Sequence, residues 1–219
     1  MAKRLEPERL PVERGAGTFG NLVRVEPIVL RGTSVRLEPL SPEHVPALMA
    51  AASADRSTYG FSLVPDQPDA MAAYVATALD EQRIGRTYAF ATVQHERIVG
   101  STRFMDIDYW EGSPVPSVLE IGGTWLTASA QRTGVNTEAK LLMLTQAFDT
   151  WQVHRVTLKT DARNERSRRA IERIGAKFEG IRRAHLVTHD GTVRDSAYFS
   201  IIASEWPDVK ARLYTLLDR

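Results

Sequence analysis

Apolar and polar residues alternate with two distinct periods along this chain of 219 residues, and these periods predict a mixture of strands and helices. A period of two, or a short continuous apolar run, indicates a strand. Such segments lie at 29–40, 87–93, 97–105, 118–126, 153–161, 177–188 and 193–202. Apolar residues at helical spacing predict helices at 42–54, 69–82, 135–151, 166–174 and 206–217. Strands, then strand–helix–strand, then strands again is the order of a mixed α/β protein.

Turn and cap residues place the boundaries between these elements. Ser41 and Pro42 are typical of a helix start, and Gly175 is typical of a helix end. His95-Glu96 and His189-Asp190-Gly191 each separate two alternating segments, which predicts two antiparallel hairpins. The segments 55–68 and 106–117 are polar and contain proline, so we expect loops there.

Length and composition favour a single domain. A chain of 219 residues can bury about 70% of its unfolded surface in one large domain. Hydrophobic residues make up 43% and charged residues 25%, as in ordinary globular proteins. Residues 1–24 mix charge, proline and glycine without a sustained period, so we expect a flexible or loosely docked extension before a domain at 25–219.

Charge and composition also remove several classes of function. The formal net charge of +1 gives no sign of a nucleic-acid partner, and no apolar run approaches the ~20 residues of a membrane span. The chain has no cysteine, which excludes disulfides and thiol catalysis and fits a cytoplasmic protein. Lys3 and Arg4 precede acidic residues rather than an apolar segment, so no signal peptide is expected. The five histidines are not at metal-ligand spacing, so we expect no metal and a structural or surface role for each.

Two strand-to-helix junctions carry the most specific chemistry. The strand at 118–126 leads through Gln131–Asn136 into an amphipathic helix, and a second strand leads through Asp161–Ser167 into another. Backbone amides at a helix start are unpaired and bind phosphate groups well. Two such junctions in tandem suggest one extended pyrophosphate ligand whose reactive end lies between the two strands.

These blocks resemble the GNAT acetyltransferases. Gln131-x-x-Gly134-x-Asn136 is similar to their acetyl-coenzyme A loop, and Asn164-x-x-Ser167 followed by 174–180 resembles a second conserved block. Ser167, together with the segment 35–40, is typical of the RimJ/RimL-like branch, which acetylates the N-termini of ribosomal proteins. The resemblance covers residues 28–207 and implies the GNAT fold, a mixed, mostly antiparallel twisted α/β sheet with helices on both faces. It also implies that the sheet is splayed at its centre, near Leu126, to admit the pantetheine arm.

The resemblance implies acetyl-CoA as the co-substrate, bound by Leu126, Gln131, Arg132, Thr133, Gly134, Val135, Asn136, Thr137 and Asn164. Asn136 departs from the glycine or alanine that the family prefers, but asparagine tolerates unusual backbone angles. From local sequence alone, the Gln131–Asn136 segment is equally an ordinary strand-to-helix turn, and Asn164 an ordinary helix cap.

Acetyl transfer to an amine needs a base for the amine and a proton for the departing thiolate. Glu120 lies within an apolar strand stretch, where burial would raise its pKa, and it is our candidate base. The alternative is a structural ion pair with a neighbouring arginine such as Arg103. Ser167 is our candidate proton donor, with bulk water as the alternative, because the tyrosine that many GNAT enzymes place seven residues after the asparagine is Ile171 here.

The acceptor is expected at the variable loops, with Asp106, Tyr109 and Tyr198 as candidate contacts, although the residues around Asp106 also fit a solvated acidic loop. The resemblance favours a primary amine at a protein or peptide N-terminus. Alternatives are a small-molecule amine and a non-catalytic, CoA-binding regulator. A homodimer is also possible for such a fold.

Overall fold

The computed structural model describes residues 8–9, 27–110, 113–188 and 191–218. One nine-stranded sheet runs through the molecule in the order β1-β2-β3-β4-β5-β6-β7-β9-β8. Its strands are β1 Glu8–Arg9, β2 Ile28–Arg31, β3 Val35–Pro39, β4 Tyr88–Gln94, β5 Arg97–Asp108, β6 Val118–Leu126, β7 Arg155–Asp161, β8 Lys177–Val187 and β9 Val193–Ile202. Apart from β1, the predicted extension 1–24 lies outside the described residues, as do His189 and Asp190 of the last hairpin.

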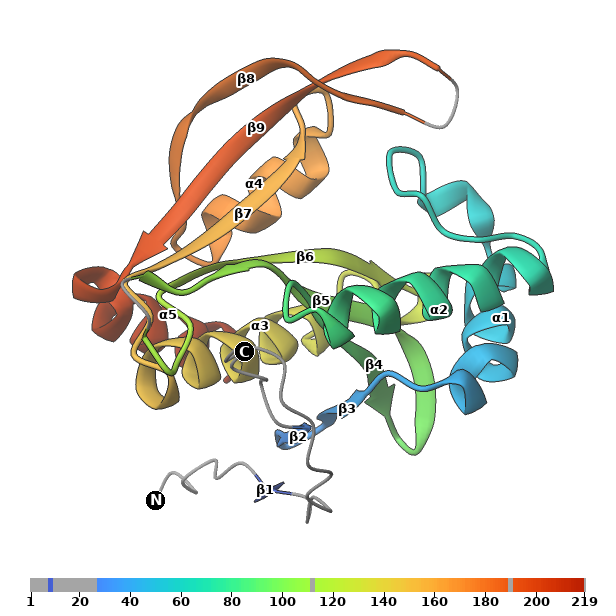
Figure 1. The fold of residues 1–219 in the computed structure, drawn as a ribbon, viewed down its shortest axis with the longest axis horizontal. Coiled ribbons are helices and arrows are strands. Elements are labelled where there is room, and N and C mark those ends of the chain that lie inside the picture. The colour runs from blue at the N-terminus through green and yellow to red at the C-terminus, as the bar shows by residue number, and fades with distance from the viewer. Residues whose placement is uncertain (1–7, 10–26, 111–112, 189–190, 219) are drawn as a thin grey trace.

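Helices cover both faces of this sheet (Figure 1). They are α1 Val45–Ser53, α2 Pro68–Arg83, α3 Val135–Thr145, α4 Glu165–Arg173 and α5 Trp206–Leu217. The buried residues of α1 and α2 form one apolar cluster with Ala89, Ala91 and Trp125. The larger cluster joins α3, α4 and α5 to the rest of the sheet, with Phe104 and Phe199 fully buried at its centre. The predicted mixed, mostly antiparallel α/β architecture is therefore confirmed.

The first predicted strand, 29–40, is wrong as a single element. It is split into β2 and β3 by a turn at Gly32–Ser34, and the two strands pair antiparallel. The Glu138 carboxylate of α3 accepts hydrogen bonds from the Thr33 and Ser34 amides. A Cβ on Gly32 would lie 2.2 Å from this carboxylate, so the turn requires glycine there.

Other boundaries moved by a few residues. β5 continues to Asp108, so the predicted loop begins after that residue. β7 begins at Arg155 rather than at 153, and the predicted helix 135–151 is α3 followed by one π-helical turn at Gln146–Thr150. Both predicted hairpins and the helix Trp206–Leu217 are confirmed. No helix in the described part of the chain is long and apolar enough to cross a membrane.

The sheet opens between its two parallel strands. β6 pairs with β7 only through Val118–Glu120 against Arg155–Thr157, whereas β7 pairs with β9 along its whole length. Beyond Glu120, β6 therefore keeps its partner β5 on one side and has no strand on the other. The unpaired edge at 121–126 is where a ligand can hydrogen-bond to the backbone of β6.

Candidate active site

Two glycines expose the backbone at the open edge of β6. Gly123 adopts φ +58°, a conformation that favours glycine, and it is exposed to solvent. A Cβ on Gly122 would lie 2.7 Å from Glu120 Oε1, and one on Gly123 would lie 2.7 Å from Arg103 Nε. Glycine at positions 122 and 123 therefore keeps this edge free of side chains. The polar groups of Glu120 and Arg103 pack closely against the two glycines.

Glu120 lies at the point where β6 and β7 diverge. Glu120 is only 4% exposed, and its Oε2 atom is 2.7 Å from Lys159 Nζ on β7. Burial raises the pKa of the Glu120 carboxyl above its ordinary value, and the charge of Lys159 opposes that rise. Lys159 also lies 3.4 Å from Asp106 Oδ2 on β5. A carboxylate with a raised pKa and one cationic neighbour is suited to accept a proton.

The proposed alternative partner, Arg103, does not pair with Glu120. Its guanidinium lies 4.7 Å from the centre of the Tyr74 ring and 3.8 Å from the Glu81 carboxylate. Arg103 is opposite Gly122 in the β5–β6 register, whereas Glu120 is opposite Met105. The cation beside Glu120 is therefore Lys159, which the sequence analysis did not single out.

The loop before α3 is fastened to the end of β6. The side-chain nitrogen of Gln131, Nε2, donates to the Leu126 carbonyl and to Thr58 Oγ1, both at 2.9 Å. Thr133 Oγ1 donates to the Ala130 carbonyl at 2.7 Å and accepts from the Val135 amide at 3.2 Å. Arg132 adopts φ +59° and is exposed. These bonds bring Leu126 and the start of α3 together, as the sequence predicted.

Gly134 and Asn136 carry the strongest sign of a ligand at this helix start. Gly134 has an ordinary helical φ of −68°, and an added Cβ would meet only Leu217, at 3.7 Å, so the fold itself does not need glycine there. Asn136 Oδ1 is buried without a hydrogen-bond partner. A buried acceptor without a partner is costly in a finished fold and is explained by a ligand or water that donates to it. Thr137 is buried and accepts from Arg173, so its side chain ties α3 to α4.

Asn164 and Ser167 lie at the start of α4, across the opening from β6. Asn164 Oδ1 accepts from the Ser167 amide at 3.0 Å, which confirms that Asn164 caps the helix. The Asn164 amide nitrogen and the Ser167 hydroxyl remain at a half-exposed position. Ile171 is buried in the core, one turn further along α4.

The three residues predicted to contact the acceptor lie in two different parts of the structure. Asp106 is exposed, with a left-handed φ of +47°, and lies beside Lys159. Tyr198 is directly opposite Lys159 in the β7–β9 register, and its hydroxyl is 3.2 Å from His185 Nε2. Tyr109 instead packs against the large apolar cluster with its hydroxyl buried and without a partner. Asp106 and Tyr198 therefore share a face with Glu120, and Tyr109 does not.

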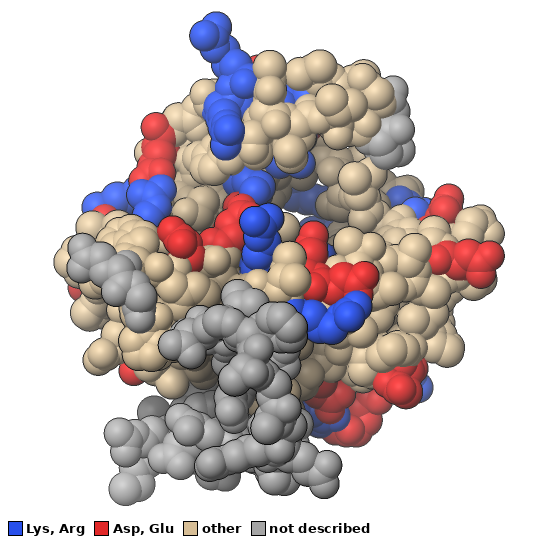
Figure 2. Space-filling view, viewed as in Figure 1, with Lys and Arg blue, Asp and Glu red and all other residues tan. Residues whose placement is uncertain are grey.

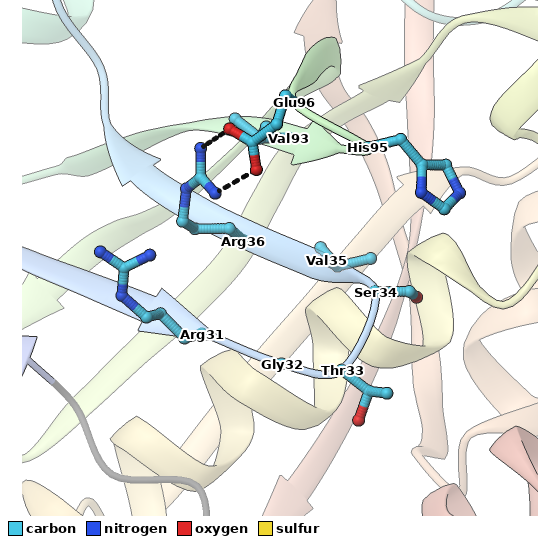
Figure 3. Close-up of a pocket in the computed structure, with 9 residues that line it drawn as sticks. All are labelled: Arg31, Gly32, Thr33, Ser34, Val35, Arg36, Val93, His95 and Glu96. Atoms are coloured by element: carbon cyan, nitrogen blue, oxygen red, sulfur yellow. Dashed lines mark hydrogen bonds and ion pairs between the residues drawn. The ribbon is translucent and has the colours of Figure 1, made fainter.

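A hollow lies between the β8–β9 hairpin and the body of the molecule, with basic and acidic side chains around it (Figure 2). A separate pocket of about 300 Å³ lies at the β2–β3 turn, and Figure 3 shows Arg36 in it bound to Glu96 through two hydrogen bonds. None of the residues predicted to act on substrate lines that pocket. That pocket is therefore separate from the opening beside Glu120.

Comparison with known proteins agrees with this geometry. Residues 34–177 match the model of the family described as the acetyltransferase (GNAT) domain. This chain belongs to the GNAT family.

Three further likenesses cover between 40% and 89% of this chain. The crystal structure of a GCN5-related N-acetyltransferase from Brucella melitensis is 32% identical, with a TM-score of 0.77 over 89% of this chain and 87% of that one. Mycobacterium smegmatis RimJ, solved in complex with CoA-disulfide, shares the fold at 22% identity and a TM-score of 0.71 over 83% of this chain and 88% of its own. A Bacillus subtilis (strain 168) protein named "Putative ribosomal N-acetyltransferase YdaF" is 33% identical over 88 residues, which are 40% of this chain. The match spans about half, 48%, of that relative.

Proposed function

We propose that this protein transfers an acetyl group from acetyl-CoA to the N-terminal amine of a protein or peptide. The observation that carries the proposal is the divergence of β6 and β7 beside a buried carboxylate, Glu120. The open edge receives an extended ligand, and the carboxylate lies where that ligand's reactive end would meet an amine.

The residues that hold the donor come from the open edge of β6 and from the starts of α3 and α4. The backbone at 122–126 offers amides and carbonyls to the two amide groups of pantetheine. The diphosphate lies at the start of α3, because a helix N-terminus favours anions and the space beside Gly134 is open. Asn164 on α4 donates to the pantetheine arm from the other side through its amide nitrogen, while its oxygen caps the helix. The donor supplies the activated thioester, and the chain needs no cysteine of its own.

The transfer proceeds by direct attack in a ternary complex. Glu120 accepts a proton from the amine nitrogen as that nitrogen forms a bond to the thioester carbon. The tetrahedral intermediate then collapses, and the carbon–sulfur bond breaks. Ser167 passes its hydroxyl proton to the departing thiolate and regains one from solvent, while Glu120 returns its proton to solvent. The products are an acetylated amine and CoA with a free thiol.

The choice of a peptide acceptor rests on the acceptor face and on the relatives. Asp106 is exposed at the rim with 72% of its side chain accessible, which suits a cationic group that arrives from solvent on a large partner. YdaF carries a ribosomal N-acetyltransferase name, and RimJ shares the fold. Acetylation of a small-molecule amine is the second candidate, because a compact acceptor could also enter the hollow in Figure 2.

A pair of matched peptides tests this choice. Each peptide contains one lysine, and one has a free N-terminus whereas the other has a formylated N-terminus. We expect acetyl-CoA-dependent mass addition to the free peptide alone, located at its first residue by fragmentation. Acetylation of the blocked peptide at lysine, or of a polyamine but neither peptide, would assign the acceptor to another class.

A further inference from the structure

Strand β8 leaves its regular register with β9 beside the acceptor face. Arg182 is opposite Ser196 and Leu186 is opposite Arg194, so four residue steps on β8 span two on β9. Within this bulge Ala184 adopts φ +48°, a conformation that is unfavourable for alanine, and its amide donates to Asp195 Oδ1 at 2.7 Å. Bulges of this kind are concentrated near active sites, where they redirect a side chain.

The redirected side chain is His185. Arg182 and Leu186 lie on the face of Ser196 and Arg194, so in a regular strand His185 would point to the opposite face. The bulge instead brings His185 Nδ1 to 2.9 Å from Ser196 Oγ and His185 Nε2 to 3.2 Å from the Tyr198 hydroxyl. The strained backbone thus yields a specific pair of contacts, one for each ring nitrogen.

Ser196 fixes the orientation of the imidazole. It is fully buried, and its hydroxyl accepts a hydrogen bond from Arg194 Nε at 3.1 Å. One tautomer of His185 donates Nδ1–H to Ser196 Oγ, and in that tautomer Nε2 carries the lone pair and accepts from the Tyr198 hydroxyl. This arrangement points the basic nitrogen of the ring at Tyr198, and Tyr198 lies opposite Lys159, the partner of Glu120.

The charges around His185 favour its neutral form. Burial and the cations Arg182, Lys159 and Arg194 lower the pKa of His185, and only Asp106 opposes them. Arg182 lies on β8, Lys159 on β7, Arg194 on β9 and Asp106 on β5. The remaining titratable neighbour is Tyr198 on β9. At neutral pH the imidazole is therefore free to take up a proton.

The reaction needs such a second proton acceptor. A peptide N-terminus has a pKa of about 8, so at neutral pH it arrives mainly as an ammonium group with three protons. The amide product keeps one of them. One proton must therefore leave before attack to free the lone pair, and another leaves as the carbon–nitrogen bond forms. Glu120 accounts for the second of these protons.

We propose that Tyr198 and His185 remove the first proton from the acceptor. The Tyr198 oxygen accepts a proton from the ammonium group while its own hydroxyl proton passes to His185 Nε2. This leaves a neutral amine, an intact tyrosine and an imidazolium, which returns its proton to solvent. Tyr198 touches the acceptor, and His185 acts through Tyr198. The proposal rests on the acetyl transfer proposed above and assigns a role to a histidine that the sequence analysis left as structural.

The test is the pH dependence of kcat/KM for peptide acetylation by His185→Gln and Tyr198→Phe. Glutamine keeps hydrogen bonds to Ser196 and Tyr198 but cannot take up a proton. We expect each variant to lose about 10–100-fold in kcat/KM near pH 6.5, where only roughly 3% of an amine with a pKa of about 8 is already neutral, and to approach wild type above pH 9. At high pH the amine arrives already deprotonated, so the relay is no longer needed. His95→Asn is the control, because His95 is exposed in a distant hairpin turn and asparagine tolerates its φ of +47°.

A loss of the same size at every pH would show a structural role for His185 and overturn the proposal, and so would the absence of a loss. NMR titration of the imidazole signals without substrate is an independent readout. We expect the pKa of His185 to lie below the ordinary histidine value, and a His185 that is still protonated at pH 7 would also overturn the relay. This titration needs no turnover, so it distinguishes failure of the relay from failure of the proposed acetyl transfer, which would appear as no activity in any variant.

Discussion

Lys159 holds its ammonium group 2.7 Å from the Glu120 carboxylate at the point where β6 and β7 part. The two residues lie on the only parallel pair of strands in the described sheet, so the feature that opens the sheet also sets the charge beside the candidate base. Burial raises the pKa of Glu120, and Lys159 limits that rise. The ion pair therefore offsets part of the rise in pKa that burial imposes on the Glu120 carboxyl.

Replacement of Lys159 by methionine tests this balance. Without the cation, burial raises the pKa of Glu120 further, so the base stays protonated to higher pH. We expect the acidic limb of the pH profile of kcat/KM to move up by roughly one pH unit or more. Lys177→Met is the control, because Lys177 is exposed and pairs with Glu205 on another part of the surface. An unmoved acidic limb would show that Glu120 does not govern it.

Replacement of Glu120 by glutamine tests the base itself. Glutamine has a similar shape but cannot accept a proton, so we expect kcat to fall about 10²–10⁴-fold. The dissociation constant for acetyl-CoA should stay unchanged, because the Glu120 side chain serves the acceptor. Glu96→Gln, at an exposed position bound to Arg36, should retain full activity. A wild-type rate at every pH would place the base elsewhere.

Gly134→Ala separates ligand binding from folding. The backbone at Gly134 is helical, and an added methyl group meets only Leu217 at an ordinary contact distance. We expect stability within about 1 kcal/mol of wild type by urea unfolding. The methyl group would occupy space that the donor's diphosphate requires, so the dissociation constant for acetyl-CoA should rise at least about tenfold, roughly 1.4 kcal/mol. Unchanged affinity would remove Gly134 from the donor site.

Lys140 on α3 allows a prediction about stability and pH. Its amine is fully buried, donates to Thr124 Oγ1 at 2.7 Å, and has a pKa lowered by burial to about 7. An unfolded lysine titrates at about 10.4, so between these values the unfolded chain binds more protons than the folded chain. The cost of burying Lys140 is therefore complete below pH 7 and is relieved as pH rises toward 10.

Lys140→Met should accordingly stabilise the fold by an amount on the order of 3 kcal/mol at pH 6–7. Thr102 and Thr124 still bond to each other without the amine, at 2.7 Å. The gain in the free energy of unfolding, measured with urea from pH 6 to pH 10, should shrink steadily above pH 7. A gain that is independent of pH would show that Lys140 is charged in the folded protein.

Most of the fold follows from local patterns, because each long element carries its own hydrophobic period. The strand Val118–Leu126 and the helix Trp206–Leu217 match the prediction residue for residue. The turn at Gly32–Ser34 was missed because the Thr33 and Ser34 amides are satisfied by Glu138, 104 residues after Ser34, and no local residue marks that contact. Long-range capping of this kind cannot be read from a single segment.

The site was predictable only in part, for the same reason. The helix starts at Gln131–Asn136 and Asn164 carry recognisable motifs. Gln131 bonds to the Leu126 carbonyl at the end of β6, and Arg166 on α4 bonds to Gln131. The partner of Glu120 depends on strand register, which places Met105 rather than Arg103 opposite it. The position of His185 depends on a bulge at Ala184, an alanine that gives no sequence signal for a left-handed conformation.

The most direct test of this account is titration calorimetry of the protein with acetyl-CoA, followed in the same sample by addition of a peptide with a free N-terminus. We predict saturable binding, then release of CoA thiol in a one-to-one ratio with acetylated peptide. The Glu120→Gln variant should bind the donor equally well and release almost no thiol. A folded protein that neither binds acetyl-CoA nor releases thiol would contradict the account.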